Sequence, residues 1–340
     1  MIEAWLSELF GKLPLIVLFG VIVVGFYALS KGADLLIEEA VTLSERWRVP
    51  KALIGATIVS LGTTLPEAAV SVLAAIQGQP GLALGNAVGS IICDTGLILG
   101  LATILTPLPL VRSVVNRQGF IQVAAAMLLV VMAFPLSGHG DIFSVGGNVP
   151  RWGGFLMLAL LAGYLSISIL WARRENRQNT LAEIEEDKRS TLWVLIKLAA
   201  GAGLVVVSSQ VLISAVTVLA LRVGVPDAVV AATLVAFGTS LPELVTAVTA
   251  VRRGHGEIAV GNIIGADILN VLFVAGAATA ATPGGLEVPP IFFRLYFPSM
   301  LAILLVFRTG IWMSGDRLKR PIGILLLLAY LAITIISYQR

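Results

Sequence analysis

The sequence GTTLPE at residues 62–67 returns as GTSLPE at residues 238–243, and GNAVGS at residues 85–90 returns as GNIIGA at residues 261–266. Both repeats have the same offset of 176 residues (62 to 238, and 85 to 261). Each copy places a glutamate directly after a Gly and Pro helix break inside an apolar stretch, where an unpaired carboxylate is unfavourable and usually functional. Duplicated broken helices with charges at their centre are typical of the ion sites of secondary transporters.

The composition is that of a polytopic membrane protein, because 57% of the 340 residues are hydrophobic and only 13% are charged. The first apolar run is longer than a signal-peptide core, so we expect it to remain as the first span. Cys93 is the single cysteine and is expected to pack as a small residue. At about 20 apolar residues per crossing, ten spans are expected, near residues 14–42, 50–77, 82–106, 113–134, 152–172, 191–221, 226–251, 257–281, 288–307 and 321–338.

The basic residues predict the topology. Placing the loops after spans 1, 3, 5, 7 and 9 in the cytoplasm collects sixteen Lys and Arg residues there, within residues 46–51, 112–117, 173–189, 252–253 and 308–320. The opposite side keeps five, namely Lys12, Arg151, Arg222, Arg294 and Arg340. This positive-inside bias puts both termini outside the cytoplasm and explains the basic residues without a nucleic-acid partner. We expect a multi-pass protein of the prokaryotic inner (plasma) membrane, with the lipid bilayer as its surroundings and no obligatory protein partner evident.

The odd number of spans in each copy inverts the second copy relative to the first. The expected fold class is therefore an all-α polytopic membrane protein with ten transmembrane helices in two inverted five-helix repeats. Residues 1–172 form the first repeat (spans 1–5), and residues 191–340 form the second (spans 6–10). Residues 173–190 mix both charge signs and are expected to be a solvated cytoplasmic linker.

The chemistry begins at the two prolines. Pro66 and Pro242 cannot donate a backbone hydrogen bond, so the carbonyls of Gly62 and Gly238 lose their helical partners and become available to cations. A break of this kind is tolerated in lipid only where the backbone faces protein or water, which places the following glutamates on an internal cavity. The structural alternative is a pair of ordinary proline kinks with protonated glutamates.

Further oxygens follow the glutamates in both copies. Asn86, Ser90 and Asp94 recur every four residues and so share one helix face. Their counterparts are Asn262, Ala266 and Asn270, and hydroxyls are added by Thr63, Thr64, Thr239 and Ser240. Such an all-oxygen set suits hard cations such as calcium and sodium.

Other residues have simpler interpretations. A zinc or copper site is not indicated, because His139 and His255 fall in predicted loops and are expected to be solvated. The small-xxx-small spacing of Gly85, Gly89, Gly261 and Gly265 predicts close helix packing.

The paired G-T-[TS]-L-P-E and G-N-x-x-G-[SA] segments resemble the alpha repeats of the calcium/cation antiporter superfamily, most of all its prokaryotic sodium/calcium exchanger branch. The resemblance is most specific over residues 50–100 and 226–276. It implies calcium binding by both repeat glutamates with the Thr63 and Thr239 carbonyls, and an inner sodium site of Thr64, Ser90, Glu67 and the Ser60 carbonyl. The candidate ion ligands are Glu67, Glu243, Thr63, Thr239, Thr64, Ser240, Ser90, Asp94, Asn270, Ser60 and Ala236, the last being the counterpart of Ser60.

The chain departs from this family pattern at several positions. Similar archaeal exchangers carry an amide in the first repeat and an acid in the second, whereas Asp94 and Asn270 exchange these roles. Ala266 stands where the family's outer sodium site has a serine hydroxyl. Ile91 and Asp267 replace a usual Asn, and the sequence leaves open whether Asp267 faces the cavity or a neighbouring helix.

These residues predict an antiporter that needs no cofactor and is not an enzyme. Carboxylates gathered in mid-membrane repel one another, so sodium ions, calcium or protons must neutralise them, and competition for one site gives exchange. The resemblance further implies that the first and sixth spans slide past a fixed core. A proton-coupled calcium exchanger remains the main alternative, and a cation channel is disfavoured by inverted repeats around one central site. No nucleophile and base pair suggests a membrane enzyme.

Overall fold

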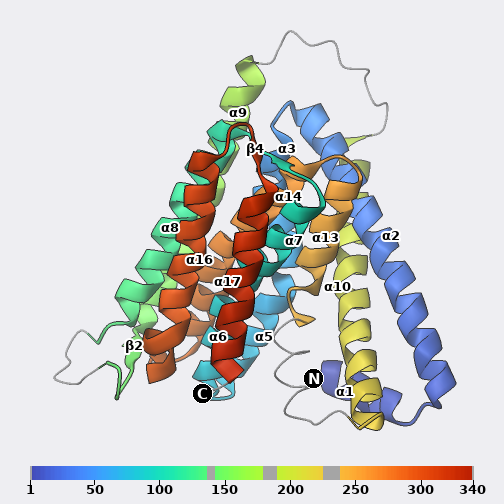
Figure 1. Ribbon diagram of the computed structural model, residues 1–340, viewed down its shortest axis with the longest axis vertical. Coiled ribbons are helices and arrows are strands. Elements are labelled where there is room, and N and C mark those ends of the chain that lie inside the picture. The colour runs from blue at the N-terminus through green and yellow to red at the C-terminus, as the bar shows by residue number, and fades with distance from the viewer. Residues whose placement is uncertain (1, 136–141, 179–189, 225–237, 339–340) are drawn as a thin grey trace.

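The structure is a computed structural model that describes residues 2–135, 142–178, 190–224 and 238–338. Within these residues, eight helices are long and apolar enough to cross a membrane, or nine if one bent pair is a single span. The bent pair is Lys51–Thr63 and Leu65–Ile76, which meet at 45°. The predicted seventh span, near residues 226–251, lies partly outside the described residues. The expectation of an all-helical polytopic membrane fold is confirmed (Figure 1).

The first half of the chain contains α1 (Ile2–Gly11), α2 (Leu15–Trp47), α3 (Lys51–Ile54), the π-helical turn η1 (Gly55–Val59), α4 (Ser60–Thr63) and α5 (Leu65–Ile76). It continues with α6 (Pro80–Ile92), the π-helical turn η2 (Cys93–Ile98), α7 (Leu99–Leu105), strand β1 (Leu108–Pro109), α8 (Arg112–Ala133), strand β2 (Gly147–Val149) and α9 (Arg151–Gln178). Helix α9 extends six residues past the predicted end of its span, into the segment predicted as a linker.

The second half contains α10 (Thr191–Arg222), α13 (Leu241–Arg252), α14 (Gly256–Leu269), η4 (Asn270–Ala275), α15 (Gly276–Ala281), strand β3 (Leu286–Val288), η5 (Phe292–Tyr296), α16 (Phe297–Met313), strand β4 (Arg317–Leu318) and α17 (Arg320–Tyr338). The sequence repeat is also a structural repeat. Helices α2 and α10, α5 and α13, and α6 and α14 each begin 176 residues apart, at 15 and 191, 65 and 241, and 80 and 256.

Helices α2 and α10 pack side by side in opposite directions (Figure 1). Arg46 in the last turn of α2 donates to the Thr191 hydroxyl at the start of α10, at 3.1 Å. At the other end of the pair, Arg222 closes α10 and donates to the Leu13 carbonyl just before α2, at 2.5 Å. Two counterpart helices of the repeat therefore run antiparallel.

Glycines let these two backbones approach closely. A Cβ on Gly32 would lie 2.9 Å from the Val205 nitrogen, and one on Gly201 would lie 2.8 Å from the Leu36 nitrogen. The outer face of the pair is apolar and exposed, as shown by Ile16, which is 81% exposed. Such a surface fits contact with lipid rather than water.

Helix α14 lies in the core, where the small-xxx-small prediction is correct for one copy only. A Cβ on Gly261 or Gly265 would collide with the carbonyl oxygen of Ala52 or Ala56 on the facing broken helix. The prediction is wrong for the first copy, because a Cβ on Gly89 would meet nothing within 4 Å.

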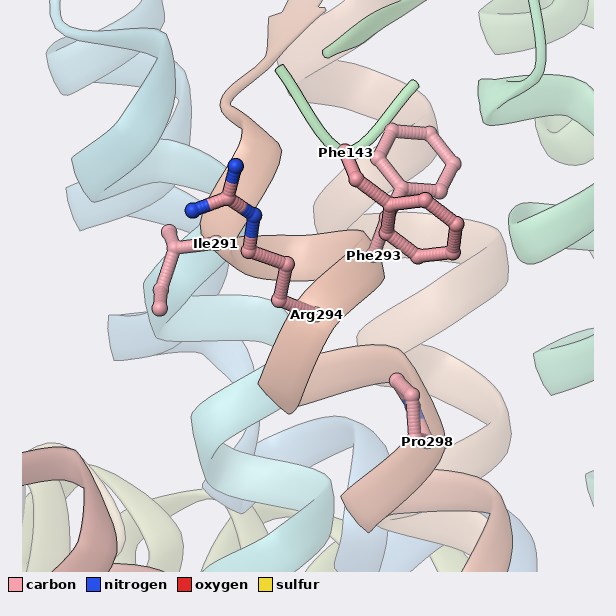
Figure 2. Close-up of a pocket in the computed structure, with 5 residues that line it drawn as sticks. All are labelled: Phe143, Ile291, Phe293, Arg294 and Pro298. Atoms are coloured by element: carbon pink, nitrogen blue, oxygen red, sulfur yellow. The ribbon is translucent and has the colours of Figure 1, made fainter. Parts of the chain in front are cut away.

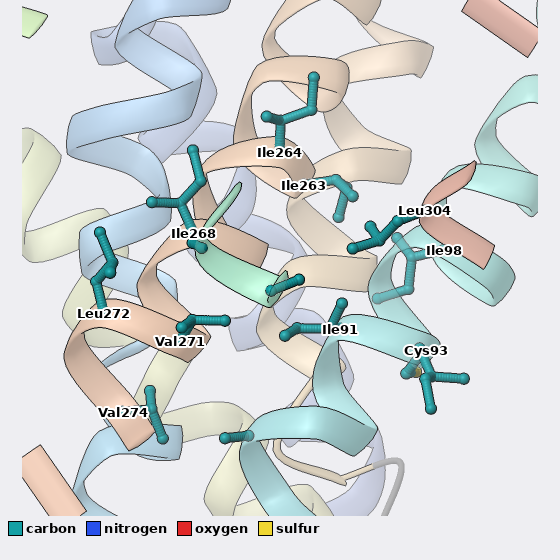
Figure 3. Close-up of a cluster of buried hydrophobic side chains, with 14 of the residues drawn as sticks. Ile91, Cys93, Ile98, Ile263, Ile264, Ile268, Val271, Leu272, Val274 and Leu304 are labelled. Atoms are coloured by element: carbon teal, nitrogen blue, oxygen red, sulfur yellow. The ribbon is translucent and has the colours of Figure 1, made fainter. Parts of the chain in front are cut away.

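Around this contact, α6 and η2 pack their apolar side chains against α14 and η4 (Figure 3). Ile91 and Ile98 of the first copy join Ile263, Ile264 and Ile268 of the second in one buried cluster. The two repeats therefore share one hydrophobic core and do not fold as separate domains.

Two short antiparallel ladders, which the sequence did not predict, join the halves. Strand β1 pairs with β4, with Leu108 opposite Leu318, and β2 pairs with β3, with Asn148 opposite Glu287. Each ladder takes one strand from each half, and the two ladders lie at opposite ends of the molecule (Figure 1). Helix α1 and the C-terminal end of α17 lie at the β2–β3 end, whereas α9 ends at the other.

Candidate cation-binding site

The two predicted helix breaks have matching backbone geometry. Thr64, between α4 and α5, has φ −82° and ψ −3°. Ser240, 176 residues later and directly before α13, has φ −85° and ψ 7°. Both lie in the sparsely populated bridge region, where many functional residues are found. Pro66 and Pro242 then stand in the first turn of α5 and α13, where the fixed φ of proline suits the start of a helix.

Each break places an acid in the first turn of the helix that follows. Glu67 in α5 and Glu243 in α13 are both 1% exposed. The Glu67 carboxyl lies within electrostatic reach of Glu243 and of Asp94, which is in η2. Three acids from two halves of the chain therefore lie within electrostatic reach of one another in the protein interior.

Asn86 on α6 connects the two breaks. Its Nδ2 donates to the Glu67 carbonyl at 3.1 Å and to the Ser71 hydroxyl at 2.9 Å. Its Oδ1 accepts a hydrogen bond from the Thr239 hydroxyl at 3.1 Å. Asn86 therefore fixes the start of α5 relative to the second repeat and has no side-chain donor left for the acids.

In the second copy, Asn262 occupies the position that corresponds to Asn86. It lies 3.4 Å from the Thr246 hydroxyl, which bonds the Glu243 carbonyl at 3.0 Å. The amide of each copy therefore supports the helix turn that carries the acid.

The predicted hydroxyls lie beside the acids. The Thr63 side chain lies against the Glu243 carboxyl, and Ser240 lies against Asp94. The Ser60 carbonyl, predicted as a sodium ligand, already accepts from the Thr64 N–H at 2.9 Å and from the Thr63 hydroxyl at 3.3 Å. Coordination of an ion by this carbonyl therefore requires the release of one of these bonds. Ala236 lies outside the described residues.

Many oxygens at the predicted positions are buried without a hydrogen-bond donor in the part of the chain that the structure describes. They are Thr64 Oγ1, both Glu67 oxygens, Ser90 Oγ, both Asp94 oxygens, Ser240 Oγ, Glu243 Oε2 and Asn270 Oδ1. Buried oxygens without a donor are unfavourable and rare. Each of these oxygens has the chemistry of a ligand for a hard cation.

The charges of the buried side chains also favour a cation at this position. Among the described side chains, no Lys, Arg or His is buried, so no positive side chain neutralises the acids. Nor do three or more His, Cys, Asp or Glu side chains there form a group that could hold a metal ion on its own. A cation at this position needs hydroxyl, amide and carbonyl oxygens in addition to the carboxylates.

His139 lies outside the described residues, and His255 is less solvated than predicted. His255 caps α14, and its Nδ1 is 3.4 Å from the Lys51 Nζ. Partial burial, followed by the charge of Lys51, lowers the pKa of His255 below its ordinary value.

Asp267 is the acid that the sequence left unassigned. It is buried on α14, accepts hydrogen bonds from Thr95 and Gln122, and lies within electrostatic reach of Asp94. The sequence did contain a signal for a polar partner of this acid, because Gln118 and Gln122 share one face of an apolar span.

A surface hollow of about 970 Å³ is separate from these acids. It is lined by Phe143, Ile291, Phe293, Arg294 and Pro298 (Figure 2). Since it contains no carboxylate, it does not contribute to the candidate site.

Comparison with known proteins gives consistent similarities along the chain. The family model described as sodium/calcium exchanger protein matches residues 17–170 and 193–339. The inner membrane protein YrbG of Escherichia coli is 32% identical over 315 residues, which cover 90% of this chain and 92% of YrbG. The sodium/calcium exchanger MaX1 of Methanosarcina acetivorans is 29% identical over 350 residues, covering 94% and 98%.

Solved structures are similar over nearly the whole chain as well. The sodium-calcium exchanger NCX_Mj soaked with 10 mM Na⁺ and no Ca²⁺ has a TM-score of 0.77 at 26% identity, covering 96% of this chain and 100% of that one. The same exchanger soaked with 2.5 mM Na⁺ and 10 mM Sr²⁺ has a TM-score of 0.75 at 27% identity, covering 95% and 99%.

Proposed function

Because the chain belongs to the sodium/calcium exchanger protein family, we propose that it exchanges calcium for sodium across a membrane by alternating access. The family makes it a multi-pass membrane transporter whose substrates are ions, and not an enzyme. The proposal rests above all on the meeting of Glu67 and Glu243, two buried acids from repeated segments, among oxygens that lack donors.

In this proposal, calcium binds between Glu67 and Glu243 with the carbonyls of Thr63 and Thr239. Sodium ions share Glu67 and use Thr64 and Ser90 in addition. The unpartnered oxygens of these side chains support the assignment. Either one calcium or several sodium ions neutralise the acids, so the two ions compete for the same ligands.

The proposed architecture has ten spans in two inverted repeats, residues 1–172 and 191–340, joined by a cytoplasmic linker at residues 173–190. The antiparallel packing of α2 against α10 supports the inversion, as do the two ladders at opposite ends of the molecule. We place the protein in the prokaryotic inner membrane with both termini outside the cytoplasm, because the basic residues favour that orientation. Helices α2 and α10 are the pair proposed to slide.

A proton-coupled calcium exchanger is the second candidate. One observation favours it. Ala266 is buried on α14 and has no hydroxyl for an outer sodium ion. Against it, the hydroxyls of Thr64 and Ser240 lie at the two breaks without a donor, where a sodium ion can use them.

The test is uptake of radioactive calcium into proteoliposomes loaded with sodium, potassium or acid. Sodium loading is expected to drive uptake, whereas potassium loading is not. Uptake driven by internal acid alone, with no response to sodium, would replace the proposal by the proton-coupled alternative. A steady calcium current without any counter-ion would indicate a channel.

A further inference from the structure

Asp267 is held by the protein through one oxygen only. Its Oδ2 accepts hydrogen bonds from the Thr95 hydroxyl of η2 and from Gln122 Nε2 of α8, both at 2.5 Å. Its Oδ1 has no hydrogen-bond partner within the described residues. The side chain is 1% exposed, so bulk solvent does not reach this second oxygen.

The negative charge of Asp267 is not balanced by the protein. No Lys, Arg or His side chain is buried in the described part of the chain, and the charged neighbour of Asp267 is another acid, Asp94. A buried carboxylate without a positive partner is strongly unfavourable. The two hydrogen bonds from neutral donors fix its position but do not cancel its charge.

Two amide side chains of α8 carry unpartnered oxygens, and one of them, Gln122, contacts Asp267. Gln122 has an unpartnered Oε1, and Gln118, one turn earlier on the same face of α8, has no described partner for either side-chain atom. Both are 1% exposed. Gln122 is the eleventh of the 22 residues of α8, so this polar group lies near the middle of a membrane span.

We propose that Asp267 Oδ1 and the side-chain oxygens of Gln122 and Gln118 form a second sodium site between α8 and α14, separate from the ligands at Glu67 and Glu243. Oxygen ligands favour a hard cation, and a single carboxylate matches a monovalent ion better than calcium. The inference rests on the proposed function in one respect, that sodium is an ion this protein handles. A sodium ion at Asp267 weakens the repulsion on Asp94 and so adjusts the exchange site without occupying it.

The experiment measures equilibrium binding of radioactive sodium to the purified full-length protein in lipid nanodiscs without calcium. In the triple variant Glu67→Gln, Glu243→Gln and Asp94→Asn, whose exchange site has lost its three charges, we expect one sodium ion to remain bound. Adding Asp267→Asn is expected to remove it. Equal sodium binding with and without Asp267→Asn, at neutral and at alkaline pH, would overturn the proposal and leave a proton as the neutralising ion.

Two further variants separate the new site from other effects. Gln118→Leu leaves Asp267 and its two donors in place and is expected to raise the half-saturating sodium concentration about tenfold, as loss of a supporting group at a metal site does. The matched control Asp34→Asn, a partly exposed acid of α2, should not change sodium binding. A triple variant that still exchanges calcium would refute the proposed exchange site, whereas sodium binding that depends on Asp267 would stand independently.

Discussion

Local backbone chemistry places Glu67 and Glu243 at equivalent positions in the two repeats. Each lies in the first turn of a helix, where the positive end of the helix dipole favours a negative charge. Both are buried, and each lies within electrostatic reach of the other. The motif predicted these two acids because a carboxylate beside a proline break in an apolar span is unfavourable and is therefore usually functional.

The surroundings of Asp267 could not be predicted in the same way. Gln122, which bonds it, lies 145 residues earlier on a helix of the other repeat. No local pattern links two residues so far apart, so only the packing of α8 on α14 shows the pair.

Removal of either repeat charge should abolish exchange. Glu67→Gln and Glu243→Gln each keep the shape of the side chain and lose its charge. We expect calcium affinity to fall on the order of a hundredfold or more, since charge count tunes oxygen-ligand calcium sites over several decades. Calcium uptake into sodium-loaded vesicles measures the effect. Glu8→Gln, a matched change at an exposed position, should keep the wild-type rate. Wild-type transport by either glutamate variant would remove that residue from the site.

Asp94 and Asn270 should act as an interchangeable pair. Asp94→Asn removes one of three mutually repelling acids, so we expect sodium competition to weaken more than calcium binding does. The swap Asp94→Asn with Asn270→Asp restores the charge on the other repeat and should restore transport. Calcium affinity measured at several sodium concentrations compares the variants. An Asp94→Asn protein that matches wild type in every ion titration would exclude Asp94 from ion binding.

At the scale of single elements, the break between α4 and α5 could be predicted and the π-helical turns could not. A proline shows a break directly, whereas η2 and η4 contain no proline, and the one glycine within them, Gly96, does not by itself indicate a π-helical turn. The stripe of Asn86, Ser90 and Asp94 assumes regular α-helix, but Asp94 lies inside η2. A π-helical turn has a different spacing from a regular α-helix, so Asp94 is displaced from the face that the stripe predicts. The counterpart turn, η4, begins at Asn270.

The glycines of α14 give a test of element packing. Gly265→Ala would press a methyl group onto the Ala56 carbonyl, which also accepts a hydrogen bond from Tyr164 at 2.7 Å. Overpacking of this kind costs about 1–3 kcal/mol, so the detergent-solubilised variant should unfold at a lower temperature. Gly89→Ala, the same change on α6 where a Cβ meets nothing within 4 Å, is the control. Equal stability of the two variants would show that α14 tolerates a wider spacing.

At the scale of the whole molecule, the repeats share one core, and at both ends a strand of one half pairs with a strand of the other. The all-helical polytopic fold could be predicted from apolar length, whereas the count of ten spans stays a prediction, because the described residues hold eight candidate spans, or nine with the bent pair. The ladders could not be predicted, because each pairs strands of two or three residues more than 130 residues apart. Ion pairs of Arg253 with Asp34 and Glu38 also tie α2 to the loop that follows α13. If α2 slides, these contacts must change.

The orientation of the inverted repeats can be tested with single cysteines, because the only native cysteine, Cys93, is buried. Lys12→Cys and Gly284→Cys lie at exposed positions near the β2–β3 end, and Ser190→Cys lies at the exposed start of α10. The excess of Lys and Arg near residues 173–189 predicts that the end of the molecule at which α10 begins faces the cytoplasm. A membrane-impermeant thiol reagent should therefore label residue 190 only in inside-out vesicles, and residues 12 and 284 only in right-side-out vesicles. Reversed labelling at all three positions would keep the fold but refute the orientation. Labelling of residues 12 and 190 from one face would refute the five-span repeat itself, because an odd number of crossings must separate them.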